Sequence, residues 1–248
     1  MFSKQVFECF HQALAQNKET KKYLNKLGVK KVNLLGNLKF TETKIKNKQN
    51  LNKNLKIFFK FKKIWCASST HDNEEIMSAI AHKTLKKNFK NLVTIIIPRH
   101  INRVDKIIKE IEDLGLITHL HSSKNKIKKN TEIYIVDTYG ETEKFFNICK
   151  TIFVGGSLVK HGGQNPLEPA RLGCKIIHGP SVNNFNEIYS LLDNNKIAVK
   201  VNNLNQFISK IRIIMKKNVS SEKLISKLKK LGDEILYSTL LEIKKLIN

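Results

Sequence analysis

A glycine-rich stretch followed by a capped helix start is the part of this sequence best suited to binding an anionic ligand. It covers residues 155–170, reads GGSLVKHGGQNPLEPA, and directly follows the apolar run at 151–154. Glycines let a backbone approach a phosphate closely, and N–H groups at a helix start are available as donors. We therefore predict a loop that receives an anionic ligand. Its candidate residues are Gly155, Gly156, Ser157 and His161.

The second half of this stretch has the signature of a helix start. Asn165 is suited to the N-cap, Pro166 to the first helical position, and Glu168 to the carboxylate of an arrangement like a capping box. A capped helix that binds nothing would carry the same three residues. The four glycines and His161 that precede it favour the ligand site.

The chain after residue 63 alternates between short apolar runs and amphipathic segments. Strands are expected at 64–67, 92–97, 132–136, 151–154 and 175–178, with helices between them. This alternation predicts an α/β fold: a Rossmann-like parallel sheet with helices on both faces. In such sheets ligands bind beyond the carboxyl ends of the strands.

Polar groups follow three of these strands: Pro98-Arg99-His100, residues 137–141 (DTYGE), and the glycine-rich loop from Gly155. Parallel strands end at one edge, so the three segments are expected to meet there. The guanidinium of Arg99 can hold a phosphate through two hydrogen bonds. The convergence of three segments predicts a binding site.

The composition limits the possible partners. The 248 residues carry a net charge of +24, yet only four of the 45 basic residues are Arg. Sites that read bases or clamp phosphates in nucleic acids rely on Arg, so nucleic-acid binding is disfavoured. Diffuse lysine charge remains compatible with an anionic membrane surface. No apolar run is long enough to span a bilayer, and the first 14 residues make a poor signal peptide.

Metal and disulfide chemistry find no support in the spacing of the relevant residues. The four cysteines are scattered and form no CxxC pair. His71, His100 and His161 follow strands or lie in the loop without the spacing of metal ligands. We expect no metal and no cofactor.

Taken together, the motifs resemble bacterial 3-deoxy-D-manno-octulosonic acid (Kdo) transferases. The resemblance rests on PRH, DTYGE, FVGGSLVKHGGQNPLEPA and GPSVNNF, which occur in the order of that family. It implies a GT-B glycosyltransferase that moves Kdo from CMP-Kdo to a lipid A precursor at the cytoplasmic face of the inner membrane. Tyr139, Lys160 and Gln164 replace the usual Met, Pro and His, so contacts at these positions are open.

The resemblance also implies roles for individual residues. Lys39, in GNLKF, matches a lysine thought to stabilise the transition state. The expected CMP-binding residues are Pro98, Arg99, Tyr139, Gly140, Glu141, Asn165, Pro166, Leu167 and Glu168. The family's donor site needs no bound metal.

Members of the family are longer and carry their general base in an N-terminal acceptor domain. We therefore expect residues 1–54 to be a remnant of that domain with a linker at 41–54, and residues 55–248 to form the CMP-sugar-binding domain. On this interpretation the chain alone is inactive, and a separately encoded N-terminal half is a candidate partner.

Three alternatives remain open at this point. The chain is compatible with a non-catalytic nucleotide-sugar-binding module or remnant. It is also compatible with a GT-B enzyme that uses another nucleotide sugar, such as a UDP-sugar. A basic binder of nucleic acids or membrane surfaces is the third.

Overall fold

Two parallel sheets organise residues 2–41, 50–217 and 220–247, which are the residues that the computed structural model describes. Each sheet belongs to its own unit. The first unit comprises residues 1–44 and 226–248, and the second comprises residues 45–225.

The second unit is built on seven parallel strands in the order β5-β6-β4-β3-β7-β8-β9. The strands are β3 (Lys63–Thr70), β4 (Leu92–Pro98), β5 (Thr118–Leu120), β6 (Ile133–Ile135), β7 (Thr151–Val154), β8 (Lys175–His178) and β9 (Ala198–Lys200). The predicted Rossmann-like α/β fold is confirmed.

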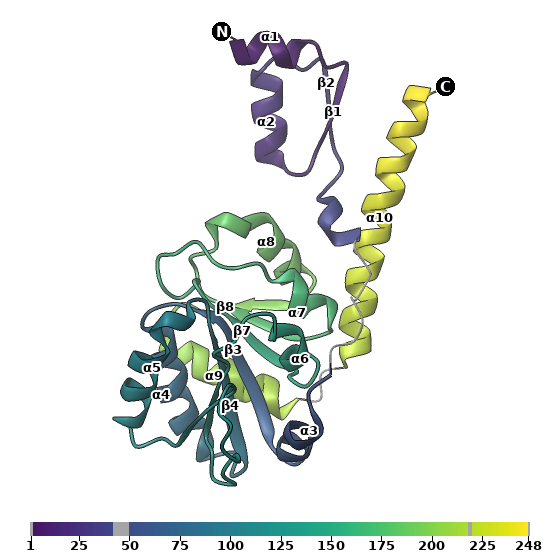
Figure 1. Cartoon of the computed structure of the whole chain (residues 1–248). Helices are drawn as coiled ribbons and strands as arrows, with labels where there is room; N and C mark the ends of the chain where they lie inside the picture. The colour runs from purple at the N-terminus through teal and green to yellow at the C-terminus, as the bar shows by residue number, and fades with distance from the viewer. Residues whose placement is uncertain (1, 42–49, 218–219, 248) are drawn as a thin grey trace. The chain divides into compact units, whose positions relative to one another are not determined.

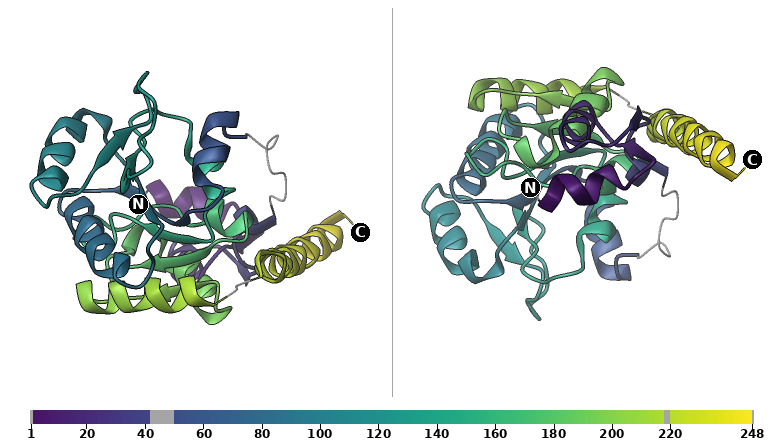
Figure 2. Two further views of the ribbon diagram at one scale, coloured as in Figure 1. Left: turned by 90° about the horizontal axis from the view of Figure 1, so that it is seen from below. Right: turned by 90° about the horizontal axis from the view of Figure 1, so that it is seen from above.

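Helices cover both faces of this sheet (Figure 1). One face carries α4 (Glu74–Lys86), α5 (Val104–Glu112) and α9 (Leu204–Lys216), and the other carries α3 (Lys53–Phe59), α6 (Thr142–Phe146), α7 (Leu167–Arg171) and α8 (Asn186–Asn194). The 3₁₀ turns η2 (Ile101–Arg103) and η3 (Asn183–Phe185) complete the unit. The views in Figure 2 place α9 and α3 on opposite sides of the strands.

Side-chain alternation along the strands explains this division. Ile133 and Ile135 of β6 pack in the cluster with α5, whereas Tyr134 between them meets Phe145 of α6 at a ring distance of 5.8 Å. Successive residues of a strand point to opposite faces, so β6 must be apolar at every position. All seven residues of β4 are buried for the same reason.

The first unit contains β1 (Gln12–Ala15), α2 (Lys18–Lys26) and β2 (Lys31–Leu34), with β1 and β2 parallel. These three elements form a strand–helix–strand unit. Helix α1 (Phe2–Glu8) precedes it and η1 (Leu38–Thr41) follows it.

Residues 226–247 of the C-terminal helix α10 (Ser221–Ile247) belong to the first unit, and two contacts join them to its N-terminal segment. A Cβ at Gly232 would lie 2.5 Å from the Phe40 carbonyl oxygen, so only glycine permits this approach. The Glu242 carboxylate accepts hydrogen bonds from Gln12 Nε2 (2.9 Å) and Asn33 Nδ2 (2.6 Å).

The units differ from the predicted domains of 1–54 and 55–248. The boundary falls between residues 44 and 45, and residues 226–248 group with the N-terminal segment because of the contacts of α10. Of the expected linker at 41–54, residues 42–49 lie outside the described residues, and Lys53 already begins α3. That the first unit is a remnant of an acceptor domain stays a prediction.

Candidate functional site

The predicted motifs share the carboxyl edge of the large sheet. Strands β6, β4, β3 and β7 are consecutive neighbours, and they end at Ile135, Pro98, Thr70 and Val154. The PRH, DTYGE and glycine-rich segments therefore begin side by side, as the sequence predicted. A fourth segment, which starts with His71 after β3, lies between them.

The carboxylate of Glu74 organises this edge. The side chain is fully buried, and its two oxygens accept four backbone N–H groups. Oε2 accepts from His71 (3.0 Å) and Gly156 (2.7 Å). Oε1 accepts from Ser157 (3.1 Å) and Leu158 (3.0 Å). One side chain thus joins the segment after β3 to the loop after β7.

Local backbone geometry allows the carboxylate to reach the loop. Asn73, immediately before α4, has a left-handed φ of 73°, a conformation that Asn tolerates better than most residues. A Cβ at Gly155 would lie 2.5 Å from the Ser69 carbonyl oxygen and 2.8 Å from Glu74 Oε2. Glycine is therefore required where the two segments meet.

The N–H groups of the loop differ from the sequence expectation. We expected them to face an anionic ligand, but those of Gly156 and Ser157 already donate to Glu74. The Ser157 hydroxyl is also engaged, since it donates to the Val154 carbonyl and accepts from the Gly179 N–H. Because Glu74 occupies these donors, a ligand of this loop has to use other groups. That Gly155, Gly156, Ser157 and His161 border the donor stays a prediction.

Burial raises the pKa of Glu74, and the four backbone hydrogen bonds oppose that rise. The carboxylate is nevertheless the form that fits, because a protonated oxygen would turn its hydrogen toward an N–H donor. Burial of a charge is costly, and these four donors offset that cost.

Three histidines form a cluster beside this loop. The rings of His71 and His161 lie 3.7 Å apart between centroids, and His100 lies 5.8 Å from His71. His71 Nε2 is 3.1 Å from Nε2 of Gln164, one of the residues that depart from the family pattern. Burial lowers the pKa of His71 to about 4, and the positive charges of His161 and His100 act in the same direction.

This depressed pKa predicts a pH-dependent stability. An unfolded His takes up a proton near pH 6.5, whereas folded His71 does so near pH 4, so stability falls as pH drops through this interval. The free energy of unfolding of the parent falls between pH 7 and pH 5. In His71→Asn this fall should be smaller by roughly 1 kcal/mol, after allowance for solvent screening. Urea unfolding followed through the single Trp65 measures the effect.

Two comparisons define the outcome. His82, whose pKa burial also lowers to about 4, should keep part of the acid sensitivity in the variant. The exposed His11 serves as a control, and His11→Asn should leave the pH profile unchanged. An unaltered profile in His71→Asn would contradict the assignment.

Arg99 and Arg103 have different surroundings at the edge. Arg103 is engaged in ion pairs with Glu75 (3.1 Å) and Asp72 (3.0 Å). The side chain of Arg99 is exposed, while its backbone N–H donates to the Thr70 carbonyl. Pro98 is buried at the end of β4 and sets the direction of this exit. Arg99 is therefore the better placed of the two to receive a phosphate.

The expected cytidine loop lies at the end of β6. Tyr139 is 67% exposed, and Gly140 has a φ of 81° with open space where a Cβ would stand. Glu141 pairs with Lys144 (2.8 Å) and lies 3.5 Å from His121 Nε2. Its carboxylate is thus held in place just before α6.

Helix α7 begins next to α6, which brings the two expected CMP segments together. Asn165 Oδ1 accepts the Leu167 N–H at 3.1 Å, but the helix starts one residue later than predicted, so Pro166 and not Asn165 is its N-cap. Glu168 is accessible to solvent. Partial desolvation and the charge of Glu143 raise the pKa of Glu168, and Arg171 offsets part of this rise.

Lys39 lies in η1 of the first unit and exposes its side chain. Asn37 shapes this turn, since its Oδ1 accepts the Lys39 N–H at 3.0 Å. The transition-state role of Lys39 stays a prediction.

Two further features of the described residues bear on function. No group of three His, Cys, Asp or Glu side chains within 2–41, 50–217 and 220–247 is arranged to hold a metal ion. The helices in the same ranges are also too short or too polar to cross a bilayer.

The fold defines the class: a Rossmann-like α/β domain of the kind that forms the C-terminal half of a GT-B fold. The C-terminal CMP-Kdo binding domain of WaaA from Acinetobacter baumannii superimposes with a TM-score of 0.66 at 27% identity. The match covers 72% of this chain and 93% of that domain.

Curated sequences agree with this match. A Kdo transferase of Rickettsia felis is 30% identical over 222 residues, or 89% of this chain and 47% of its own. A Kdo transferase of Haemophilus influenzae is 31% identical over 174 residues, which are 69% of this chain and 40% of that protein. The chain is thus a relative of Kdo transferases and spans about half the length of these relatives. No family model matches the chain.

Glu74 is the functional residue that the sequence reasoning missed. By sequence it is one of two acids in the first turn of a helix, where any exposed Glu could stabilise the helix dipole. The pair Glu74-Glu75, four residues past the end of β3, is the available signal, but Gly156, whose N–H Glu74 accepts, lies 82 residues away. Only the sheet order joins the two segments.

Proposed function

We propose that the second unit binds CMP-Kdo and serves as the donor half of a Kdo transferase. The observation that carries this proposal is the meeting of the strand-end motifs at one edge of a domain that matches a CMP-Kdo binding domain. Charge supports it too, because the exposed guanidinium of Arg99 lies at the edge where an anionic ligand would bind.

Each segment has a part in holding the nucleotide. Arg99 binds the phosphate through its guanidinium, which can form two parallel hydrogen bonds with it. The backbone at Tyr139 and Gly140 contacts the cytosine, where the open space at Gly140 permits a close approach. The carboxylate of Glu168 accepts hydrogen bonds from ribose hydroxyls.

In the proposed reaction an acceptor hydroxyl attacks the anomeric carbon of Kdo, and the bond from that carbon to the CMP phosphate oxygen breaks. CMP departs with the electron pair, and the hydroxyl proton passes to a base. That base belongs to an acceptor-binding part outside this chain. The relatives are about twice as long as this chain, which is long enough to include such a part. The acceptor is a lipid A precursor at the cytoplasmic face of the inner membrane. A separately encoded N-terminal half is a candidate partner.

The test of donor binding is titration calorimetry with CMP. Arg99→Ala should weaken CMP binding by roughly 1.5–3 kcal/mol, the scale of a hydrogen bond to a charged group. Arg99→Lys keeps the positive charge but cannot form two parallel hydrogen bonds. Its affinity for CMP should therefore lie between those of the parent and Arg99→Ala. Lys109→Ala, on the exposed side of α5, is the control and should bind like the parent.

Two results would contradict the proposal. Equal affinity for CMP in Arg99→Ala would remove the phosphate assignment. Binding of UDP as tightly as CMP would indicate a different nucleotide sugar.

A further inference from the structure

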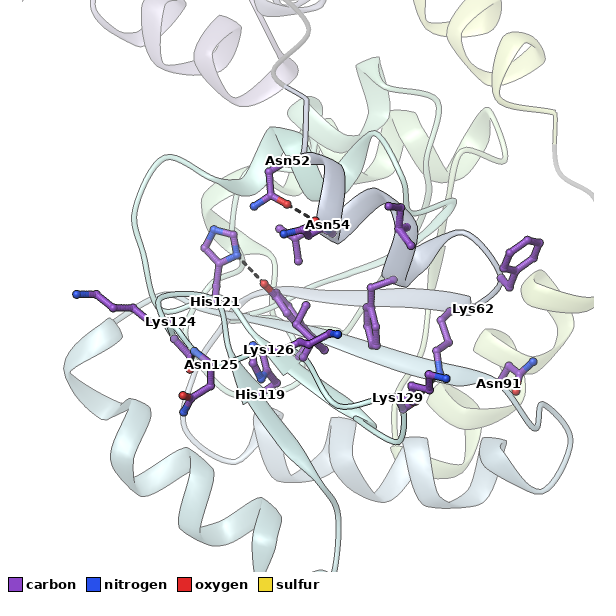
Figure 3. A pocket seen from close by; sticks show the side chains of 17 residues that line it. Asn52, Asn54, Lys62, Asn91, His119, His121, Lys124, Asn125, Lys126 and Lys129 are labelled. Atoms are coloured by element: carbon purple, nitrogen blue, oxygen red, sulfur yellow. Dashed lines mark hydrogen bonds between the residues drawn. The ribbon is translucent and has the colours of Figure 1, made fainter.

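Helix α3 stands between two cavities that contain none of the expected CMP-binding residues. The first has a volume of about 990 Å³ and lies between α3 and the segment at 119–134. The second, about 680 Å³, lies between α3, the start of β3 and the end of α9. Figure 3 shows the first, where Lys62 and Lys129 lie close to each other and Lys124 and Lys126 come from the facing segment.

The charged side chains that line the two cavities are all positive. The linings of the two cavities hold nine lysines and, among the described residues that form them, no Asp or Glu. The nine are Lys56, Lys60, Lys62, Lys63, Lys124, Lys126, Lys129, Lys150 and Lys217. We call this surface, with the exposed side of α3, the α3 face.

Large apolar side chains stand exposed among these lysines. Phe61 is 78% exposed and Ile57 is 61% exposed. Ile57 belongs to α3 and Phe61 lies two residues past its end, and both line the first cavity. The buried side of the helix is anchored by Phe59, whose ring lies 5.4 Å from that of Tyr134.

Several contacts hold the lysines near the aromatic rings. Lys60 Nζ lies 5.3 Å from the centre of the Phe61 ring, and Lys62 Nζ lies 5.3 Å from that of Phe58. Lys62 also donates to the Lys129 carbonyl at 2.9 Å, which ties the facing segment to the helix. The α3 face is therefore a structured surface that combines cations with protruding apolar groups.

We propose that the α3 face docks on the surface of a bilayer that contains anionic phospholipids. Lysines at such a surface attract anionic headgroups, and an exposed Phe and Ile can enter the boundary between headgroups and acyl chains. Nucleic acid fits less well, because the face lacks the Arg side chains on which phosphate and base recognition rely. This inference deepens the membrane location in the proposed function, but it requires neither nucleotide binding nor transfer.

Vesicle co-sedimentation of the full chain tests the proposal. Vesicles of phosphatidylcholine with about one third phosphatidylglycerol should bind the chain, and pure phosphatidylcholine vesicles should bind it at least tenfold more weakly. Lys56→Glu with Lys60→Glu should reduce partition into the anionic vesicles at least tenfold. Ile57→Ser with Phe61→Ser should also reduce it about tenfold, and the residual binding should depend more steeply on salt.

The matched control carries the same charge change elsewhere. Lys109→Glu with Lys200→Glu replaces two exposed lysines on α5 and β9, and should bind within about twofold of the parent apart from the general loss of charge. Circular dichroism checks that each variant is folded, and CMP binding should be the same in all of them.

The result that would overturn the proposal is equal partition of the α3-face variant and the control variant. Tight binding of a single-stranded oligonucleotide that the α3-face substitutions abolish, with vesicle binding unchanged, would assign the face to nucleic acid. If the parent chain does not bind CMP, the proposed function is contradicted. The vesicle experiment would still test the membrane docking of the α3 face.

Discussion

Replacement of Glu74 by Ala is expected to lower the free energy of unfolding of the second unit by about 3–5 kcal/mol. The substitution removes one carboxylate and leaves four N–H groups without their acceptor, in a place where Glu74 is fully buried. Urea unfolding monitored by Trp65 measures the change, since this single Trp is buried in β3 of the same unit.

Glu74→Gln gives a sharper version of the same test. Each oxygen of Glu74 accepts two N–H groups, so an amide placed there turns its NH₂ toward two donors whichever way it is oriented. We expect a loss of about half that of Glu74→Ala. Glu110→Gln, in a surface pair with Lys106, is the control and should change stability by less than ~0.5 kcal/mol.

The same variants connect the fold to the site. If Glu74 holds the glycine-rich loop in place, Glu74→Gln should also weaken CMP binding at temperatures where the variant remains folded. Stability within ~1 kcal/mol of the parent in Glu74→Ala would contradict the structural role of this carboxylate.

Lys39→Met is expected to lower turnover by a factor of about 10²–10³ in an enzyme assembled with an acceptor-binding part, while leaving CMP affinity within about twofold. Negative charge grows on the CMP phosphate as the bond to Kdo breaks. A cation that acts on this developing charge contributes more in the transition state than in the ground state.

Glu168→Gln provides the opposite pattern for comparison. Contacts to ribose exist before the chemical step, so this change should weaken CMP binding more than it lowers turnover at saturating donor. Calorimetry and steady-state kinetics are both required, because either alone confuses binding with catalysis. If Lys39→Met keeps turnover within about twofold, a barrier change under ~0.5 kcal/mol, Lys39 has no part in the chemistry.

Features that depend on local pattern were predictable. The continuous apolar run at 92–97 predicted a strand buried on both faces, because a parallel strand between two helical layers has no polar side. The helix start near Asn165 followed from the local residues to within one position, and Asn165 Oδ1 accepts the Leu167 N–H there. Helix α3, in contrast, was partly assigned to a linker, because lysines and asparagines outnumber its buried Leu55 and Phe59.

Features that depend on distant partners were not predictable. The contacts of Glu242 with Gln12 and Asn33 join residues more than 200 positions apart, so nothing in the local sequence indicated that residues 226–248 group with the N-terminal segment. The donors of the glycine-rich loop were likewise assigned to a ligand, since nothing in the local sequence shows that Glu74 reaches them.

The sequence by itself determined the class of fold and the motifs at the strand ends, because strand periodicity, turns and caps are set by neighbouring residues. It also carried the resemblance to Kdo transferases, which rests on runs such as GGSLVKHGGQNPLEPA. Only the tertiary structure decided which polar groups remain available to a ligand. A buried donor binds whichever acceptor the packing brings within about 3 Å, and in this protein the order of the strands brings Glu74 to the loop and leaves Arg99 exposed.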